Sequence, residues 1–223
     1  MSFYVKVKET VRKVAPGFAY NYLKRIKRYI DNVTFTSKIV CHTFGGVPLT
    51  VSIEDHIGCS WYDCDWPELR EFELLRSRKL QIGATVFEVG AHQGIVAMML
   101  AKIVGPTGRV IAVEADRRCA EIARKNLALN DITNVELVQA AVAAITGEVS
   151  FAEGSHIARG ERGQDTQMVN AVTVDDLRKE FGIPDVLFID VEGYECQVLH
   201  GAQETLRNRP DLFVEIHVGV GLE

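Results

Sequence analysis

Residues 84–114 hold the pattern that most constrains the fold: an apolar strand, a glycine turn, a helix and a second strand that ends in an acid. The first strand runs to Val89, Gly90 and Gly94 lie in the turn, and the second strand closes on Glu114. The intervening helix carries the chain back, so that the second strand can run parallel to the first. The pattern therefore predicts a doubly wound α/β fold, with helices on both faces of a mostly parallel sheet.

The residue types in the turn suit a nucleoside ligand. Glycines permit positive φ and let a ligand approach bare main chain, and the following helix directs backbone N–H groups toward it. A carboxylate such as Glu114 can accept hydrogen bonds from both hydroxyls of a ribose. The dinucleotide pattern Gly-x-Gly-x-x-Gly is missing, because Ala91 and His92 occupy positions where further glycines would be expected. An α/β unit with a tight turn and no ligand is the structural alternative.

An acid two residues before the first glycine refines this prediction. The resulting pattern, acid-x-Gly-x-x-x-Gly, begins at Glu88. It fits a ligand that has a ribose and a positively charged end but no pyrophosphate. The pattern resembles the first motif of Rossmann-like methyltransferases that use S-adenosyl-L-methionine.

Length and composition are those of an ordinary globular protein. The chain has 223 residues, of which 47% are hydrophobic and 25% charged, and this length fits one α/β domain with an N-terminal extension. We predict an extension over residues 1–66 and a Rossmann-like domain over residues 67–223. The longest apolar run is too short to span a bilayer, and the first residues lack the apolar segment of a secretory signal. Five cysteines without a Cys-x-x-Cys pair indicate reduced thiols and a cytoplasmic location.

Charge is distributed unevenly along the chain. Residues 1–30 contain eight basic residues and one acid, whereas the remainder contains 17 basic and 29 acidic residues. An acidic main domain argues against a nucleic-acid substrate. The basic arm could contact an anionic membrane, an anionic substrate or a partner protein; the alternative is a solvated helix whose aromatic residues pack inward.

Between the arm and the main strand unit, the sequence predicts a β-hairpin within residues 34–57 around Gly45-Gly46, and a helix over residues 67–79. The spacing of His56, Cys59 and Cys64 is looser than that of structural zinc sites, so we predict no zinc there. The polar, glycine-rich residues 153–167 predict a surface loop that could act as a lid.

Polar side chains also follow two later apolar strands. Asp190 and Glu192 end one strand, and Glu215 and His217 end the last one. Because residues i and i+2 of a strand point the same way, each pair can face one site. Acids at the ends of buried strands are costly to desolvate unless a ligand, metal or catalytic role compensates. In open α/β sheets, ligands bind outside the carboxyl ends of the strands, so we expect these side chains to converge there.

Taken together, five segments resemble the FkbM family of methyltransferases: 88–94, 134–141, 172–177, 189–202 and 214–217. The resemblance covers residues 67–217, and residues 190–202 are its most specific part. It implies O-methylation of hydroxyls on sugars, glycolipids or polyketide-type natural products, with S-adenosyl-L-methionine as methyl donor. No metal ligand is predicted. At the strand ends we predict catalytic roles for Asp190 and His217. We predict cofactor contacts for Glu88, Gly90, Ala91, His92, Gly94, Glu114, Ala115 and Ala140.

Two features depart from the family pattern. The first motif usually opens with Asp and carries Asn-Ile where this chain has His92-Gln93. The sequence also ends soon after His217, where the usual sheet continues into a hairpin of two more strands. If those strands are absent, we expect the N-terminal arm or a second subunit of a homodimer to complete the acceptor wall.

The residues also suggest a mechanism. An alcohol is a poor nucleophile while protonated, so we expect a general base, and His217 ordinarily titrates near neutral pH. The alternative for His217 is a structural histidine bound to backbone. Asp190 would orient the acceptor hydroxyl or the methionine amino group, and Glu192 would stabilise the following helix rather than bind a cation. Two other functions stay open: a non-catalytic nucleotide-binding module and an NAD-dependent oxidoreductase. The small residues around Ala140 leave room for an adenine ring or simply pack.

Overall fold

A five-stranded parallel sheet lies at the centre of the computed structural model, which describes residues 34–152, 156–157 and 166–217. Its order is β11-β10-β3-β4-β5. The strands are β3 (Thr85–Val89), β4 (Arg109–Glu114), β5 (Val135–Gln139), β10 (Val186–Ile189) and β11 (Asp211–Val214), and all neighbours pair in parallel. The chain builds outward from β3 to β5 and then returns to the other side of β3 with β10. This confirms the predicted Rossmann-like fold and puts its switch point between β3 and β10.

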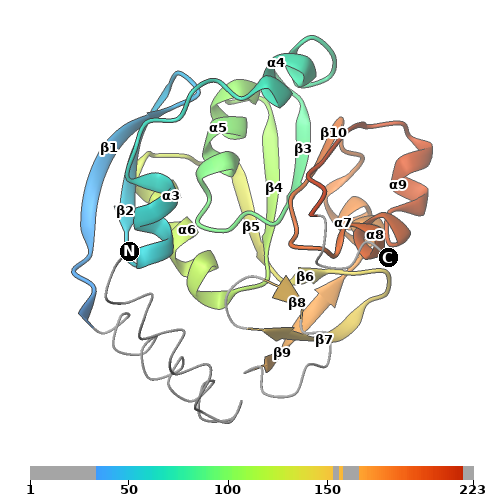
Figure 1. Cartoon of the computed structure of the whole chain (residues 1–223). Coiled ribbons are helices and arrows are strands. Elements are labelled where there is room, and N and C mark those ends of the chain that lie inside the picture. The colour runs from blue at the N-terminus through green and yellow to red at the C-terminus, as the bar shows by residue number, and fades with distance from the viewer. Residues whose placement is uncertain (1–33, 153–155, 158–165, 218–223) are drawn as a thin grey trace.

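Helices cover both faces of this sheet (Figure 1). The helices α5 (Ile95–Val104) and α6 (Arg117–Leu129) lie on one face. On the other lie α7 (Val174–Phe181), α8 (Glu195–His200) and α9 (Gln203–Arg207). Strand alternation separates the two cores: Val86 packs on the α5 side, while Phe87 and Val89 pack on the α7 side. Within the described residues no helix is long and apolar enough to cross a membrane.

The described part of the N-terminal extension packs into the α5-side core. The predicted hairpin is confirmed as β1 (Lys38–Phe44) and β2 (Val47–Ile53), followed by α3 (His56–Tyr62). Phe44 and Val51 are fully buried in that core. The side chains of Asn126, in α6, and Asn130, at its C-cap, accept hydrogen bonds from the β2 backbone, both at 2.8 Å. The predicted basic arm and its interactions lie outside the described residues.

The helix predicted over residues 67–79 was too long. The helix α4 covers Arg70–Arg76 instead of 67–79, because Trp66 exchanges backbone hydrogen bonds with Thr43 and Gly45 beside β1 and keeps the preceding chain extended. The segment 194–207 divides into α8 and α9 at Gly201. There the backbone comes so close to Ala143 that a Cβ on Gly201 would lie 2.2 Å from its carbonyl oxygen.

A second sheet of four strands continues from β5, in the order β6-β9-β7-β8. Its strands are β6 (Ala141–Val142), β7 (Gly147–Ala152), β8 (His156–Ile157) and β9 (Thr166–Val172). The predicted loop over residues 153–167 was therefore too long, since it contains β8 and the start of β9. The rest of that loop, and with it the predicted lid, lies outside the described residues.

Candidate functional site

The carboxyl ends of β3 and β10 come into close contact at the switch point. Gly90 follows β3 with φ of 97°, and its N–H donates to the Val113 carbonyl at 2.9 Å. A Cβ built on Gly90 would lie 1.8 Å from the Asp190 carbonyl oxygen. A glycine is needed here because the neighbouring strand end occupies the side-chain space, a reason beyond the ligand approach predicted from the sequence.

The rest of the turn carries the chain into α5. Gly94 is the N-cap of that helix with φ of 82°, and a Cβ there would lie 3.0 Å from the Ala123 Cβ. Ala91 is buried. His92 has a backbone φ of 48°, a value that residues other than glycine seldom adopt. The turn is therefore held in one defined conformation by packing against α6 and by the contacts of its neighbours.

Glu114 fixes the backbone of this turn. One carboxylate oxygen accepts the His92 N–H at 2.6 Å, and the other accepts the Asp116 N–H at 2.7 Å. Burial raises the pKa of Glu114 to about 7, although these backbone donors lower it. Each oxygen thus already holds a backbone partner, a role that the sequence did not predict; the predicted contact with a ribose stays a prediction.

Glu88 lies beneath the turn instead of at its surface. It is 2% exposed, and its Oε2 atom has no hydrogen-bond partner among the described residues. Burial raises the pKa of Glu88 to about 8, and the charges of Asp190 and Glu114 add to this shift. Strand alternation explains this grouping. Each of the three acids comes two positions after a residue that packs on the α5 side of the sheet, so all three side chains point to that side. The predicted direct contact between Glu88 and the cofactor stays a prediction.

The two predicted alanines lie at the adjacent strand ends. Ala140 is 5% exposed and donates its N–H to the Glu114 carbonyl at 3.1 Å. Ala115 is partly buried and packs against a small cluster that includes Ala141 and Ala171. Both are small residues at the carboxyl ends of β4 and β5, and their predicted contacts with the cofactor stay predictions.

The catalytic candidates meet at the ends of β10 and β11. The His217 Nε2 atom lies 3.7 Å from the Asp190 carboxylate and 3.8 Å from that of Glu215. The His217 Nδ1 atom lies 2.9 Å from the Glu195 carboxylate. Glu195 is 1% exposed and also accepts the Gly193 N–H at 3.0 Å. Asp190, Glu215 and His217 thus face one site, whereas Glu192, the predicted partner of Asp190, is exposed and lies outside this group.

Glu195 lies in the helix that follows Asp190, whereas the helix-stabilising role predicted for Glu192 stays a prediction. Helix α8 begins at Glu195, which is the acid in its first turn, and Glu192 is exposed. Because Glu195 bonds both the turn and the His217 ring, it holds the imidazole in one orientation. Glu195 is visible in the sequence as an acid five positions after Asp190, but its contact with His217 arises only in the folded structure.

Burial and nearby charges shift the pKa values of both catalytic candidates, Asp190 and His217. Burial raises the pKa of Asp190 to about 6, with Glu215 adding to the shift and His217 opposing it. Burial alone would lower the pKa of His217, but the Glu195 hydrogen bond and the nearby carboxylates of Glu192, Asp190 and Glu215 raise it above its ordinary value.

Three of these side chains could also hold a metal ion. Ligand atoms of Asp190, Glu215 and His217 lie within 4.8 Å of one another. At the segment considered for zinc, by contrast, Cys59 Sγ contacts Asp63 and Cys64 Sγ contacts the Trp61 carbonyl. Among the described residues, that segment forms no metal-binding group.

Two residues at the glycine turn, Tyr62 and Gln93, were not predicted from the sequence. Tyr62 of α3 places its hydroxyl 2.5 Å from the His92 Nδ1 atom. Gln93 is fully buried, and its amide donates to Asp55 at 3.0 Å. Nothing in the local sequence marks Tyr62, because its partner lies thirty positions further along the chain.

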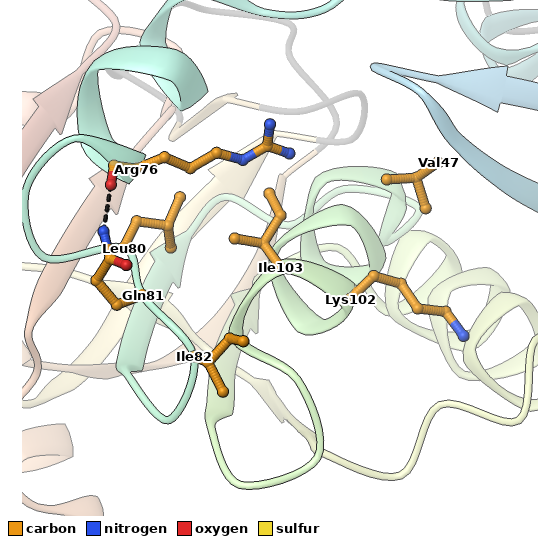
Figure 2. A pocket seen from close by; sticks show the side chains of 7 residues that line it. All are labelled: Val47, Arg76, Leu80, Gln81, Ile82, Lys102 and Ile103. Carbon is orange, nitrogen blue, oxygen red and sulfur yellow. Dashed lines mark hydrogen bonds between the residues drawn. The ribbon is translucent and has the colours of Figure 1, made fainter.

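A hollow of about 390 Å³ lies at the opposite end of the sheet. Figure 2 shows its lining, in which Leu80 and Ile103 lie under the extended Arg76 side chain while the Lys102 ammonium points away. Leu80 precedes β3 and Ile103 lies near the end of α5. The hollow is therefore at the amino ends of the strands and separate from the side chains described above.

Comparison with known proteins matches residues 88–220 to the methyltransferase FkbM domain. A probable cobalt-precorrin-6B C(15)-methyltransferase (decarboxylating) from Sulfolobus acidocaldarius is 32% identical over 83 residues, covering 37% of this chain and 43% of that protein. The ribosomal protein L11 methyltransferase of Pelobacter propionicus is 37% identical over 62 residues, covering 28% of this chain and 19% of that protein. The chain thus spans less than half the length of these curated relatives.

Two solved structures found by comparison are methyltransferases by description. A methyltransferase FkbM from Methylobacillus flagellatus has a TM-score of 0.46 and 19% identity, covering 59% of this chain and 32% of that chain. A precorrin-6y C5,15-methyltransferase from Geobacter metallireducens has a TM-score of 0.45 and 17% identity, covering 67% of this chain and 62% of that chain.

The sequence match extends over more than half of the chain and includes the glycine turn and both catalytic candidates. It confirms the predicted family, and with it S-adenosyl-L-methionine as the cofactor. This protein belongs to the FkbM methyltransferase family.

Proposed function

We propose that this protein transfers the methyl group of S-adenosyl-L-methionine to a hydroxyl of a small-molecule or glycan acceptor, such as a sugar, a glycolipid or a natural product. The observation that supports this proposal most is the His217 imidazole, held by the buried Glu195 carboxylate 2.9 Å away and lying beside Asp190. An imidazole oriented by a carboxylate is a suitable general base for an alcohol.

The residues at the turn fit a cofactor that carries positive charge. Among the described residues, the pKa of Glu88 is raised by burial and by the carboxylates of Asp190 and Glu114. Burial and three carboxylates also raise the pKa of Asp190, and His217 opposes them. A cationic ligand would offset this accumulation of negative charge. Glu88 also has a buried oxygen to which no described residue donates a hydrogen bond. The turn from Gly90 to Gly94 would hold the adenosyl part of the cofactor.

The chemistry asks little more of the protein than position and one proton transfer. The cofactor supplies an electrophilic methyl group on a positively charged sulfur. Asp190 accepts a hydrogen bond from the acceptor hydroxyl and aligns its oxygen. With the cofactor bound, the His217 Nε2 atom would accept the hydroxyl proton as the acceptor oxygen takes up the methyl group. Glu195 accepts the Nδ1–H and stabilises the imidazolium that results.

Two measurements test this function. Calorimetric titration with S-adenosylhomocysteine, compared with NAD, tests the cofactor class. Incubation with S-adenosyl-L-methionine and a panel of sugars, glycolipids and polyketides, followed by mass spectrometry, tests for O-methylated product. Binding of NAD instead of S-adenosylhomocysteine would favour an oxidoreductase, and binding without any transfer across the panel would favour a non-catalytic module.

A further inference from the structure

The backbone of His92 is fixed independently of its ring. Its φ of 48° is held by the hydrogen bond from its N–H to Glu114 at 2.6 Å. With the backbone fixed, the direction in which the imidazole presents its N–H depends on the ring's own partner.

That partner comes from the N-terminal extension. Tyr62 is the last residue of α3 and only 6% exposed. Its ring lies 5.6 Å from the His92 ring and 5.7 Å from the Trp66 ring. Its hydroxyl lies 2.5 Å from the His92 Nδ1 atom, a distance at which one of the two atoms donates a hydrogen bond to the other.

The protonation states indicate which atom donates. Burial raises the pKa of Tyr62, with nearby Cys119, Glu88 and further carboxylates adding to the shift, so the phenol keeps its proton. Burial lowers the pKa of His92, although the carboxylates of Asp55 and Asp116 oppose this, so the imidazole is neutral at neutral pH. A neutral imidazole has one N–H and one acceptor nitrogen, and that nitrogen is more basic than a phenol oxygen. The hydroxyl therefore donates to Nδ1, and the ring proton is on Nε2.

The other end of α3 holds the next residue of the turn. Asp55 caps α3 by accepting the Gly58 N–H at 2.6 Å, and its second oxygen accepts the Gln93 amide at 3.0 Å. A Cβ on Gly58 would lie 2.6 Å from the Gln93 Oε1 atom, so helix and turn are in close contact. The extension thus contacts both His92 and Gln93, at the centre of the glycine turn.

From this geometry we propose that Tyr62 is a positioning residue of the cofactor site: its hydroxyl holds His92 in the Nε2–H tautomer, so that the ring offers one hydrogen-bond donor to an acceptor atom of the cofactor. The proposal rests on the proposed function, because it takes the glycine turn to be where S-adenosyl-L-methionine binds. It assigns to the extension a direct part in cofactor binding.

The tautomer can be measured on the protein without any cofactor. Protein with 15N-labelled histidine gives separate Nδ1 and Nε2 signals in long-range 1H–15N spectra, and His92→Asn identifies the His92 pair. We expect a protonated Nε2 in the parent protein and a mixture of tautomers in Tyr62→Phe, which removes only the hydroxyl. An Nδ1–H tautomer in the parent, or an unchanged ring in Tyr62→Phe, would overturn the proposal.

Cofactor affinity gives the second readout. Tyr62→Phe should weaken S-adenosylhomocysteine binding about threefold to tenfold, the scale of one hydrogen bond, and should add no further loss in a His92→Asn background. Ser52→Ala is the matched control, since it removes a buried hydroxyl of the same extension that bonds Glu54 instead of the turn; we expect it to leave affinity and tautomer unchanged. Additive losses in the double variant would contradict the proposal. If the parent protein failed to bind S-adenosylhomocysteine at all, the proposed function would fail while the tautomer measurement would still stand.

Discussion

Gly90 and Asp190 lie one hundred positions apart in the sequence, yet the Gly90 Cα approaches the Asp190 carbonyl so closely that no side chain fits between them. A Cβ on Gly90 would lie 1.8 Å from that oxygen. This contact joins the carboxyl ends of β3 and β10 at the switch point of the sheet. It therefore links the glycine turn, on the predicted cofactor side, to the predicted acceptor side.

Gly90→Ala should destabilise the protein by roughly 2–4 kcal/mol, because the strain of a positive φ adds to overpacking against β10. Gly46→Ala is the control, since Gly46 also has a positive φ of 81°, but a Cβ added there would meet nothing within 4 Å among the described residues. We expect Gly46→Ala to cost only about 1–2 kcal/mol. Urea unfolding compares the two, and equal losses would show that contact with Asp190 contributes nothing.

Glu114→Ala should weaken binding of S-adenosylhomocysteine by roughly 1.5–3 kcal/mol, the scale of losing hydrogen bonds to a charged group. The structure adds a reason, because this substitution also releases the His92 and Asp116 N–H groups that hold the turn. Calorimetry measures the affinity. Unchanged affinity would remove Glu114 from the cofactor site and from control of the turn.

His217→Ala should reduce turnover by about 10²–10⁴-fold, the range expected for loss of a general base, while S-adenosylhomocysteine affinity stays nearly the same. The expectation follows from the place of His217 after β11 and beside Asp190, since His217 is not among the residues predicted to contact the cofactor. Rate and binding measurements on the same preparation separate the two effects. Equal turnover in variant and parent would make His217 a structural residue.

Turnover should rise with pH through a pKa above 6.5, because His217 must be neutral to accept a proton and its pKa is raised in the folded protein. Burial lowers this pKa, whereas Glu195, Glu192, Asp190 and Glu215 raise it and prevail. Glu195→Gln removes the charge of the residue that hydrogen-bonds Nδ1, so the profile should move to lower pH. A profile that does not move would show that His217 is not the titrating base.

Turnover should not change after removal of metal ions with a chelator, because a histidine base is sufficient for methyl transfer from a sulfonium. The measurement matters here, since Asp190, Glu215 and His217 are close enough to hold an ion. Loss of activity that Mg²⁺ or Mn²⁺ restores would reassign these three side chains as metal ligands.

Local patterns in the sequence were sufficient for the central strand–helix–strand unit and for the class of fold. The glycine turn between an apolar strand and a helix predicted β3, α5 and β4, whose periodicities are properties of contiguous residues. Strand alternation also predicted that Asp190 and His217 lie at strand ends that converge, because parallel strands end at the same edge of a sheet.

Only the tertiary structure decided how these side chains are held. The partners Tyr62 and His92, Glu195 and His217, and Gly90 and Asp190 are distant in the sequence, and nothing local to either member predicts the pairing. Each contact depends on how far neighbouring strands and helices extend and how closely they pack. For that reason the sequence determined which chemistry is present at the sheet edge, while the packing determined its orientation and protonation.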